Sequence, residues 1–261
     1  MNSYRYFNIS KEEGIATILF DHPPVNALNQ KVMKELDELL DVLKNDPETK
    51  VIIFTSQGQQ AFIAGAEIGE FRQILSGSQA EGLARSGQSV LNKIENMTKP
   101  VIAAIHSVCL GGGNELIMAC HIRISSDRAR FGQPEINLGI VPGFGGTQRL
   151  PRVVGLSKSV ELILTGDMIT AQEAFRIGLV NAVVPDQDLL KQTKGLAKKI
   201  ASKGMPAVAQ ALSLIYLSRH ASFEEGLKEE ARAFGKICET EDMKEGVTAF
   251  LEKRQPQFKN R

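Results

Sequence analysis

Two glutamates, twenty residues apart, are the side chains of this sequence that most directly predict chemistry. Glu115 comes just after the glycine run 111–113, and Glu135 lies in the segment Phe131-Gly132-Gln133-Pro134-Glu135. Three successive glycines let backbone N–H groups approach a ligand, because no Cβ stands in the way. Two carboxylates that converge on one oxygen can take a proton from water and deliver one to a carbon. The pattern predicts acid–base chemistry beside a backbone N–H site.

The glycine run does not match the other glycine motifs that bind or attack ligands. A dinucleotide fingerprint needs a third glycine where Leu116 stands, a phosphate-binding loop needs Gly-Lys-Ser/Thr, and a nucleophile elbow needs Gly-x-Ser-x-Gly. Two interpretations remain open from the glycines alone. They build an anion or oxyanion site at a helix N-terminus, or they form a turn that permits close packing.

Each carboxylate also has an ordinary explanation. Glu115 falls in the first turn of a helix, where a charge–dipole pairing is worth ~0.3–1 kcal/mol. Residues 116–120 are apolar almost all round, so that helix is buried, and a carboxylate there costs desolvation unless it has a partner or a task. Glu135 taken alone fits a surface loop. Residues 64–67 could supply a second N–H donor or form a small-residue turn, and residues 143–146 open a helix or form a flexible loop.

Strand-like and helix-like segments alternate through the first two thirds of the chain. Strands are expected at 14–20, 51–55 and 101–105, the last two as continuous apolar runs. A helix with Leu36 and Leu40 on its apolar face is expected to begin at the N-cap Asn29, and a long helix is expected at about 79–97, before Pro100. The alternation predicts an α/β core with largely parallel pairing.

The last quarter of the chain, from Asp186 onward, shows helical patterns only. Ser222 and Glu225 form a predicted capping box. The two helices expected after it each have an apolar face: Leu227, Ala231, Phe234 and Ile237 on one, and Met243, Val247, Phe250 and Leu251 on the other. Such faces pack against the chain's own core or against another subunit.

Composition excludes several classes of function. The 261 residues have a formal charge of +1, which gives no electrostatic footprint for nucleic acid or an anionic membrane. No run approaches the ~18 apolar residues of a membrane span, and no targeting segment is evident at the N-terminus. Three irregularly spaced cysteines fit a reducing compartment, and the four histidines form no metal-binding pattern. We therefore expect a cytoplasmic protein without a metal site.

Taken together, the segments resemble the crotonase superfamily and, within it, the enoyl-CoA hydratases. The matching segments follow one another in the family's order: residues 61–67, 99–105, 111–115, 131–135 and 142–150. The likeness extends through Leu164-Thr165-Gly166, residues 171–178 and Glu252-Lys253-Arg254, and so covers nearly the whole chain. Two departures concern the CoA site. Glu67 stands where the family often has Asp, and Gly69 where it often has Lys.

The resemblance implies an architecture and an assembly. Residues 1–200 would form a crotonase-like spiral of ββα units that contains the acyl-CoA site. Residues 201–261 would form a helical region used for trimerisation. The protein would be a trimer, or a hexamer built as a dimer of trimers. No cofactor is implied, since coenzyme A is part of the substrate.

The resemblance also assigns roles to individual residues. The backbone N–H groups of Ala66 and Gly112 would form an oxyanion hole for the thioester. Glu115 and Glu135 would hold the water and act as base and acid, in an order that stays open, and Gly143 would position the water or Glu135. The expected CoA-binding residues are Val25, Asn26, Ala27, Ala64, Ile68 and Lys253, the last reaching the 3′-phosphate of its own or a neighbouring subunit's ligand.

These roles imply a 2-enoyl-CoA hydratase of fatty-acid β-oxidation or a related acyl-CoA degradation. Superfamily members with one of the two glutamates tend to run other chemistry, and both glutamates are present here. The alternatives within the fold are Δ3,Δ2-enoyl-CoA isomerisation and hydration of a branched or aromatic acyl-CoA. Two further classes are an RNA-binding homologue, which the +1 charge disfavours, and a structural oligomer. The sequence does not specify acyl chain length.

Overall fold

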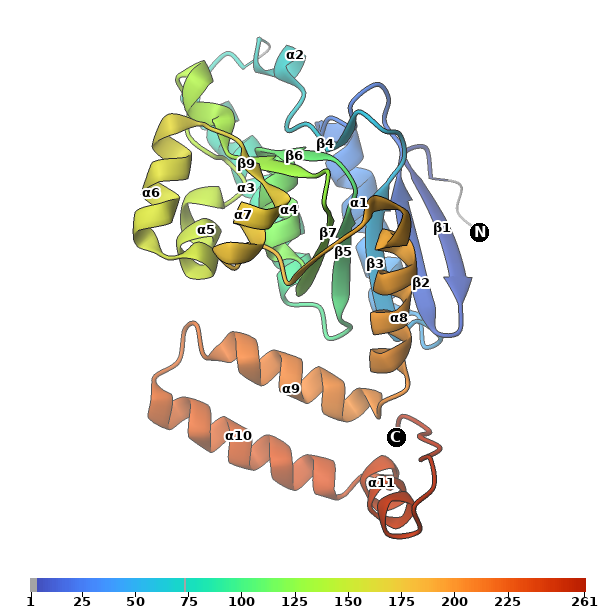
Figure 1. Cartoon of the computed structure of the whole chain (residues 1–261). Coiled ribbons are helices and arrows are strands. Elements are labelled where there is room, and N and C mark those ends of the chain that lie inside the picture. The colour runs from blue at the N-terminus through green and yellow to red at the C-terminus, as the bar shows by residue number, and fades with distance from the viewer. Residues whose placement is uncertain (1–3, 73) are drawn as a thin grey trace.

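The protein, described here from a computed structural model over residues 4–72 and 74–261, contains two β-sheets wrapped by helices (Figure 1). The six-stranded sheet has the order β1-β2-β3-β5-β7-β10, and the four-stranded sheet has the order β4-β6-β8-β9. The first comprises β1 (Phe7–Glu12), β2 (Ile15–Phe20), β3 (Val51–Ser56), β5 (Val101–Ile105), β7 (Ile122–Ser126) and β10 (Ala182–Val184). The second comprises β4 (Ala61–Ile63), β6 (Val108–Leu110), β8 (Arg130–Gly132) and β9 (Ile169–Thr170).

The chain alternates between the two sheets, which makes it a spiral. Three consecutive strand pairs, β3/β4, β5/β6 and β7/β8, each give their first strand to the large sheet and their second to the small one. Neighbouring strands pair in parallel throughout, apart from the antiparallel pairs β1/β2 and β8/β9. Helices follow the pairs and return the chain to the next turn. The expected α/β spiral of ββα units is therefore confirmed.

The central strands are buried because helices cover both faces of the large sheet. Every residue of β3 and β5 is buried, as their continuous apolar sequences predict. One face packs on α1 (Gln30–Asn45), α3 (Gly77–Glu95) and α4 (Gly112–Ala119). The other face packs on α8 (Leu189–Ala201). The core thus lies in two layers, one on each side of the six-stranded sheet.

Local signals set the helix boundaries. The side chain of Asn29 accepts a hydrogen bond from Val32 N at 2.9 Å, so α1 begins at the predicted N-cap. Helix α3 ends at Glu95, before Pro100, as expected. The remaining short elements of the core are α2 (Ile68–Phe71), the 3₁₀ segment η1 (Pro134–Leu138), α5 (Gly146–Val154), α6 (Leu156–Thr165), α7 (Ala171–Arg176) and the 3₁₀ segment η2 (Asp186–Asp188).

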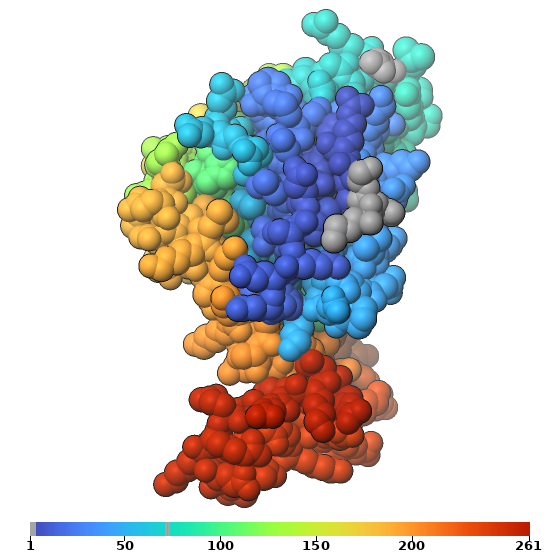
Figure 2. All heavy atoms as spheres, turned by 90° about the vertical axis from the view of Figure 1, so that its right-hand side faces the viewer, coloured from blue at the N-terminus to red at the C-terminus, as the bar shows by residue number. Residues whose placement is uncertain are grey.

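The C-terminal region is set apart from the spiral. It consists of α9 (Met205–Leu217), α10 (Phe223–Cys238) and α11 (Glu241–Leu251), which lie beyond one end of the core (Figures 1 and 2). The predicted capping box of Ser222 and Glu225 is present at the start of α10. Phe223, Phe234 and Phe250 are 72–82% exposed. No helix in the described parts of the chain is long and apolar enough to cross a membrane.

Candidate active site

Glu115 lies in the first turn of α4 and is almost completely buried, with 1% of its surface exposed. Its Oε1 accepts two backbone hydrogen bonds, from Phe144 N at 2.8 Å and from Gly146 N at 2.6 Å. Both donors belong to the turn that leads from η1 into α5. The buried carboxylate therefore has fixed partners, and its position is set by a loop 29–31 residues further along the chain.

Glu135 reaches the same place from η1. Its Oε1 accepts a hydrogen bond from Gln133 Nε2 at 3.1 Å, and Gln133 Oε1 accepts one from Asn114 Nδ2 at 2.8 Å. A Cβ built on Gly146 would lie 2.9 Å from Gln133 Nε2 and 3.0 Å from Glu115 Oε1. The Gln133 amide is thus a neighbour of both carboxylates, and the two predicted catalytic side chains lie together.

Two buried oxygens of this cluster, Asn114 Oδ1 and Glu135 Oε2, have no hydrogen-bond partner among the described residues. Glu135 Oε2 is buried, and no donor among the described residues reaches it. Buried polar atoms are nearly always paired, so an unpaired carboxylate oxygen identifies a place where a ligand group is needed. A water or an acyl group held between Glu115 and Glu135 could satisfy it.

The surroundings of both carboxyl groups favour the protonated form. Burial, and then the neighbouring Glu135, raise the pKa of Glu115 to about 7. The N–H groups of Gly146 and Phe144 and the charge of Arg149 act in the opposite direction and lower this pKa. Burial also raises the pKa of Glu135, and the Gln133 amide opposes this. Near neutral pH such a pair can both give and take a proton, which is what general acid–base catalysis needs.

The expected oxyanion donors lie on two neighbouring segments. Ala66 forms a parallel bridge with Leu28, in which Leu28 N donates to Gly65 O and Glu67 N donates to Leu28 O. In that arrangement the Ala66 N–H points away from Leu28. Gly112 is the first residue of α4, where an N–H has no acceptor within the helix. Within the described residues, neither N–H has a hydrogen-bond partner.

Apolar side chains border the Gly112 N–H. A Cβ built on Gly112 would lie 3.3 Å from Leu28 Cδ1 and 3.5 Å from Phe144 Cδ2. Phe144 therefore contributes its N–H to Glu115 and its ring to the wall beside Gly112. The glycine run therefore permits close packing, and the role of its N–H groups as an oxyanion site stays a prediction.

Five of the six expected CoA-binding residues lie in one region of the structure, which the segments 25–27 and 64–68 form. Ala64 N donates to Val25 O at 3.1 Å, and Ala27 O accepts from the His22 ring at 2.7 Å. Ile68 is 59% exposed at the start of α2. The Asn26 side chain is buried and bonded to His22 N, Gln57 O and Ala61 O, so it holds the loop in shape.

Lys253 does not lie with this group. It follows α11, at the opposite end of the molecule from α2 (Figure 1). Its side chain is exposed. A contact between Lys253 and CoA therefore requires a ligand bound to another subunit.

Gly143 is closer to the site, and its carbonyl accepts a hydrogen bond from Gln88 Nε2 at 2.8 Å, which ties the loop before Phe144 to α3.

Three residues that contribute to this geometry were not singled out from the sequence: Gln133, Phe144 and Gly146. All three lie in the segments 131–135 and 142–150, which the sequence analysis used, but the sequence does not show which backbone groups point into the site.

In the described parts of the chain, no group of three or more His, Cys, Asp or Glu side chains is arranged to hold a metal ion.

Comparison with known proteins agrees with the fold and identifies the family. A sequence profile of the enoyl-CoA hydratase/isomerase family matches residues 10–261. A probable enoyl-CoA hydratase of Bacillus subtilis is 45% identical over 97% of this chain and 98% of its own. A crotonyl-CoA hydratase of Syntrophomonas wolfei is 44% identical over 98% of both chains. The chain belongs to the enoyl-CoA hydratase/isomerase family of the crotonase superfamily.

Solved structures agree with this assignment. The crystal structure of an enoyl-CoA hydratase from Bacillus anthracis has a TM-score of 0.94 to this chain and 36% sequence identity. The match covers 98% of this chain and 100% of that one. The crotonase fold expected from the sequence is thereby confirmed.

Proposed function

We propose that this protein is an enoyl-CoA hydratase, which adds water across the 2,3 double bond of a 2-enoyl-CoA to give a 3-hydroxyacyl-CoA. The observation that supports this most is the pairing of the buried Glu115 with the half-buried Glu135, beside two backbone N–H groups that have no acceptor among the described residues. The relatives named above include a crotonyl-CoA hydratase. The reaction needs no cofactor, because coenzyme A is part of the substrate.

In the proposed mechanism, the thioester oxygen lies at the N–H groups of Ala66 and Gly112. Negative charge develops on that oxygen as water attacks the β-carbon, and fixed N–H donors stabilise it without reorganising. One glutamate accepts a proton from the attacking water, and the other delivers a proton to the α-carbon. One O–H bond of water and the π bond between C2 and C3 break, one C–O and one C–H bond form, and the glutamate pair ends with the same number of protons.

The two carboxyl groups differ in their hydrogen-bond partners, and either could act as the base with the other as the acid. Glu115 Oε1 accepts two backbone N–H bonds, which stabilise its ionised form. Glu135 Oε2 is buried with no donor from the described protein, a setting that favours a proton on this carboxyl group. The two groups titrate as a unit, so the activity should follow a bell-shaped pH profile that belongs to the pair.

Crotonyl-CoA hydration by the purified protein tests this function directly. A panel of 2-enoyl-CoAs of increasing chain length, with a branched and an aromatic member, would then define the substrate class. A 3-enoyl-CoA tests the isomerase alternative. Turnover of the 3-enoyl-CoA well above that of every 2-enoyl-CoA would contradict the proposal and favour double-bond migration.

We also propose that residues 201–261 form the oligomerisation region of a trimer, or of a hexamer made of two trimers. The exposed apolar residues of α10 and α11 support this assignment. If Lys253 binds CoA, a neighbouring subunit must supply it, because α11 lies at the opposite end of the molecule from α2 (Figure 1). Light scattering tests the assembly, and a monomer at micromolar concentration would contradict it. A cytoplasmic location and a place in fatty-acid β-oxidation stay predictions.

A further inference from the structure

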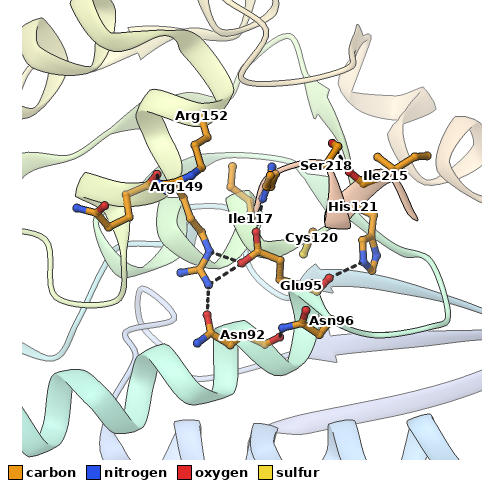
Figure 3. Close-up of polar contacts among 12 residues, drawn as sticks. Asn92, Glu95, Asn96, Ile117, Cys120, His121, Arg149, Arg152, Ile215 and Ser218 are labelled. Carbon is orange, nitrogen blue, oxygen red and sulfur yellow. Dashed lines mark hydrogen bonds and ion pairs between the residues drawn. The ribbon is translucent and has the colours of Figure 1, made fainter. Parts of the chain in front are cut away.

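Glu95, the last residue of α3, joins two arginines from different parts of the chain. Its Oε2 accepts hydrogen bonds from Arg149 of α5, from Nε at 3.1 Å and from Nη2 at 2.9 Å (Figure 3). Its Oε1 accepts one from Arg219, which follows α9. The Arg149 side chain is 8% exposed and that of Glu95 is 16% exposed. Glu95 is therefore a mostly buried link between the spiral core and the C-terminal region.

The opposite edge of the Arg149 guanidinium lies beneath the loop that holds Glu115. Its Nη1 donates to Phe144 O at 2.8 Å. Its Nη2 also donates to Asn92 Oδ1 at 2.6 Å (Figure 3). A Cβ built on Gly145 would lie 2.4 Å from Arg149 Nη1, and Gly145 has φ +104°. Only glycine allows this backbone shape and this close approach. The loop and the guanidinium thus fit each other closely.

Arg149 acts on Glu115 through geometry and through charge. Phe144 donates its N–H to Glu115 while its carbonyl accepts from Arg149, so one peptide-linked residue joins the two side chains. The ionisable groups that face Glu115 are Glu135 from η1, which raises its pKa, and Arg149 from α5, which lowers it. The charge of Arg149 is balanced by Glu95, which Arg219 also contacts.

The contact between α9 and the core at this place is polar and open. A cavity of about 610 Å³ lies beside the network, lined by residues of α3, α5 and the end of α9, including Asn92, Arg149 and Tyr216. The Arg219 guanidinium lies 4.6 Å from the centroid of the Tyr216 ring, which fixes its direction. The ion pair of Arg219 with Glu95 joins the C-terminal region to the core on this side, beside the edge contact of the Tyr216 ring with the His121 ring.

We propose that Arg149 is a positioning residue that holds the loop 144–146 around Glu115, and that Arg219 acts on the same loop through Glu95 and Arg149. The orientation of the C-terminal helices is in this way coupled to the carboxylate of α4. The inference rests on the proposed function only for the catalytic role of Glu115. An ion pair that served stability alone would not need its arginine to bond the carbonyl of Phe144.

The first experiment compares Arg149→Gln with Arg152→Gln in crotonyl-CoA hydration. Arg152 lies on the same helix, is exposed, and donates to Gln148 O, so its loss removes the same charge without touching the loop. We expect Arg149→Gln to lower kcat by ~10²-fold, because displaced catalytic groups lose rate steeply. KM should change by less than about threefold. Arg152→Gln should leave both constants unchanged.

The second experiment separates the charge from the geometry. Arg149→Lys keeps the positive charge but cannot reach Phe144, Asn92 and Glu95 at once. The titration of the Glu115 carboxyl group, followed by NMR with isotope-labelled glutamate and assigned with Glu115→Gln, needs no turnover. Its midpoint should shift to higher pH in Arg149→Gln and stay near the wild-type value in Arg149→Lys and Arg152→Gln. Both Arg149 variants should lose kcat.

The third experiment tests the route through Glu95. Arg219→Gln should lower kcat by about two- to fivefold, and the double variant with Arg149→Gln should be no slower than Arg149→Gln alone, since residues that act through one another are not additive. If the loss of kcat in the double variant equalled the product of the two single losses, Arg219 would not act through Glu95 and Arg149. A kcat within twofold of wild type in folded Arg149→Gln, with an unmoved Glu115 midpoint, would overturn the positioning role.

Failure of the proposed function is recognised separately. If the wild-type protein hydrates no enoyl-CoA, the function is wrong, yet the NMR midpoint of Glu115 still reports on Arg149. If Arg149→Gln does not fold, Arg149→Lys and Arg219→Gln decide the question through kcat and the same midpoint.

Discussion

Helices α4 and α9 are both mainly apolar, yet they differ in how far the rest of the chain buries them. All eight residues of α4 are buried inside the spiral, whereas α9, with Gln210 and Ser213 as its polar side chains, has no buried residue. Helix α4 meets strands and helices from three turns of the same chain. Helix α9 meets chiefly α10. An apolar helix needs other residues packed against it. The topology decides whether these come from the same chain or from another subunit.

The difference extends to polar groups. Helix α4 holds Glu115, whose desolvation cost is offset in part by two N–H bonds and which is proposed to have a catalytic task. In the C-terminal region Asp242 is buried and bonded to backbone N–H groups of Lys259 and Asn260, whereas other charges form pairs nearer the surface, such as Arg254 with Glu252. Such surface pairs are worth little. The chemistry is thus concentrated where the chain covers itself.

The largest effect is expected from the two glutamates of the self-covered region. Glu115→Gln and Glu135→Gln should each lower kcat for crotonyl-CoA by ~10²–10⁴-fold, the usual worth of a general acid or base. Gln keeps the volume, so CoA affinity and the fold should survive. Because both groups act on one water, the double variant should be little slower than the slower single variant. Near-normal hydration by Glu135→Gln would exclude the two-glutamate mechanism.

Glu115 should also make the stability of the core depend on pH. Its pKa is raised from 4.5 to about 7, so below pH 4.5 it is protonated in both states and costs nothing. Between these values the folded state retains a proton that the unfolded state has lost, and stability falls as pH rises. The full effect is about 3 kcal/mol. Denaturant unfolding at pH 5 and pH 8 should show Glu115→Gln gaining stability over wild type at the higher pH.

The C-terminal helices expose apolar side chains, so a charge placed among these side chains should weaken assembly. Phe234→Glu and Phe250→Glu remove exposed aromatic side chains of α10 and α11. If these pack on another subunit, each variant should weaken assembly by ~10²-fold, since a buried unpaired charge costs several kcal/mol. Leu190→Glu on α8, 48% exposed, is the control from the core. Sedimentation that finds the Leu190 variant dissociated and the Phe variants assembled would reverse the assignment.

A smaller effect is expected from a pair of glycines in α3. A Cβ on Gly87 would lie 2.2 Å from Phe144 Cε1, whereas a Cβ on Gly82 would meet nothing within 4 Å. Gly87→Ala should therefore displace Phe144, destabilise the protein by about 1–3 kcal/mol and lower kcat. Gly82→Ala should stabilise α3 by up to ~1 kcal/mol and leave kcat unchanged. Thermal unfolding and turnover of both variants check this contrast.

The smallest effect is expected at Lys253. If it reaches the 3′-phosphate of a neighbouring subunit's CoA, Lys253→Ala should raise KM by about three- to tenfold with kcat nearly unchanged, because the contact is equal in ground and transition states. The rise should vanish in an assembly-deficient Phe250→Glu background. A KM that is unchanged across several enoyl-CoAs would remove Lys253 from the binding site.

Much of the fold followed from local signals. The N-cap of Asn29, the apolar runs of β3 and β5, and the capping box at Ser222 each appear where the sequence placed them. Strands β1 and β7 were not predicted, and neither were the short strands β6, β8, β9 and β10, whose two or three residues give no measurable period. Strands β6, β8 and β9 pair within the second sheet, and β10 pairs with β7 at the edge of the first, so each depends on residues far away in the chain.

The candidate site divides in the same way. The residue types and their spacing indicated Glu115, Glu135 and a glycine-lined N–H site, because side chains that can move protons and residues without a Cβ are visible in a sequence. Only the tertiary structure decided that Phe144 and Gly146 hold Glu115, that Gln133 lies between the carboxylates, and that Arg149 lies beneath the loop. These are contacts between backbone and side-chain atoms far apart in the chain, and no local pattern specifies which N–H points inward.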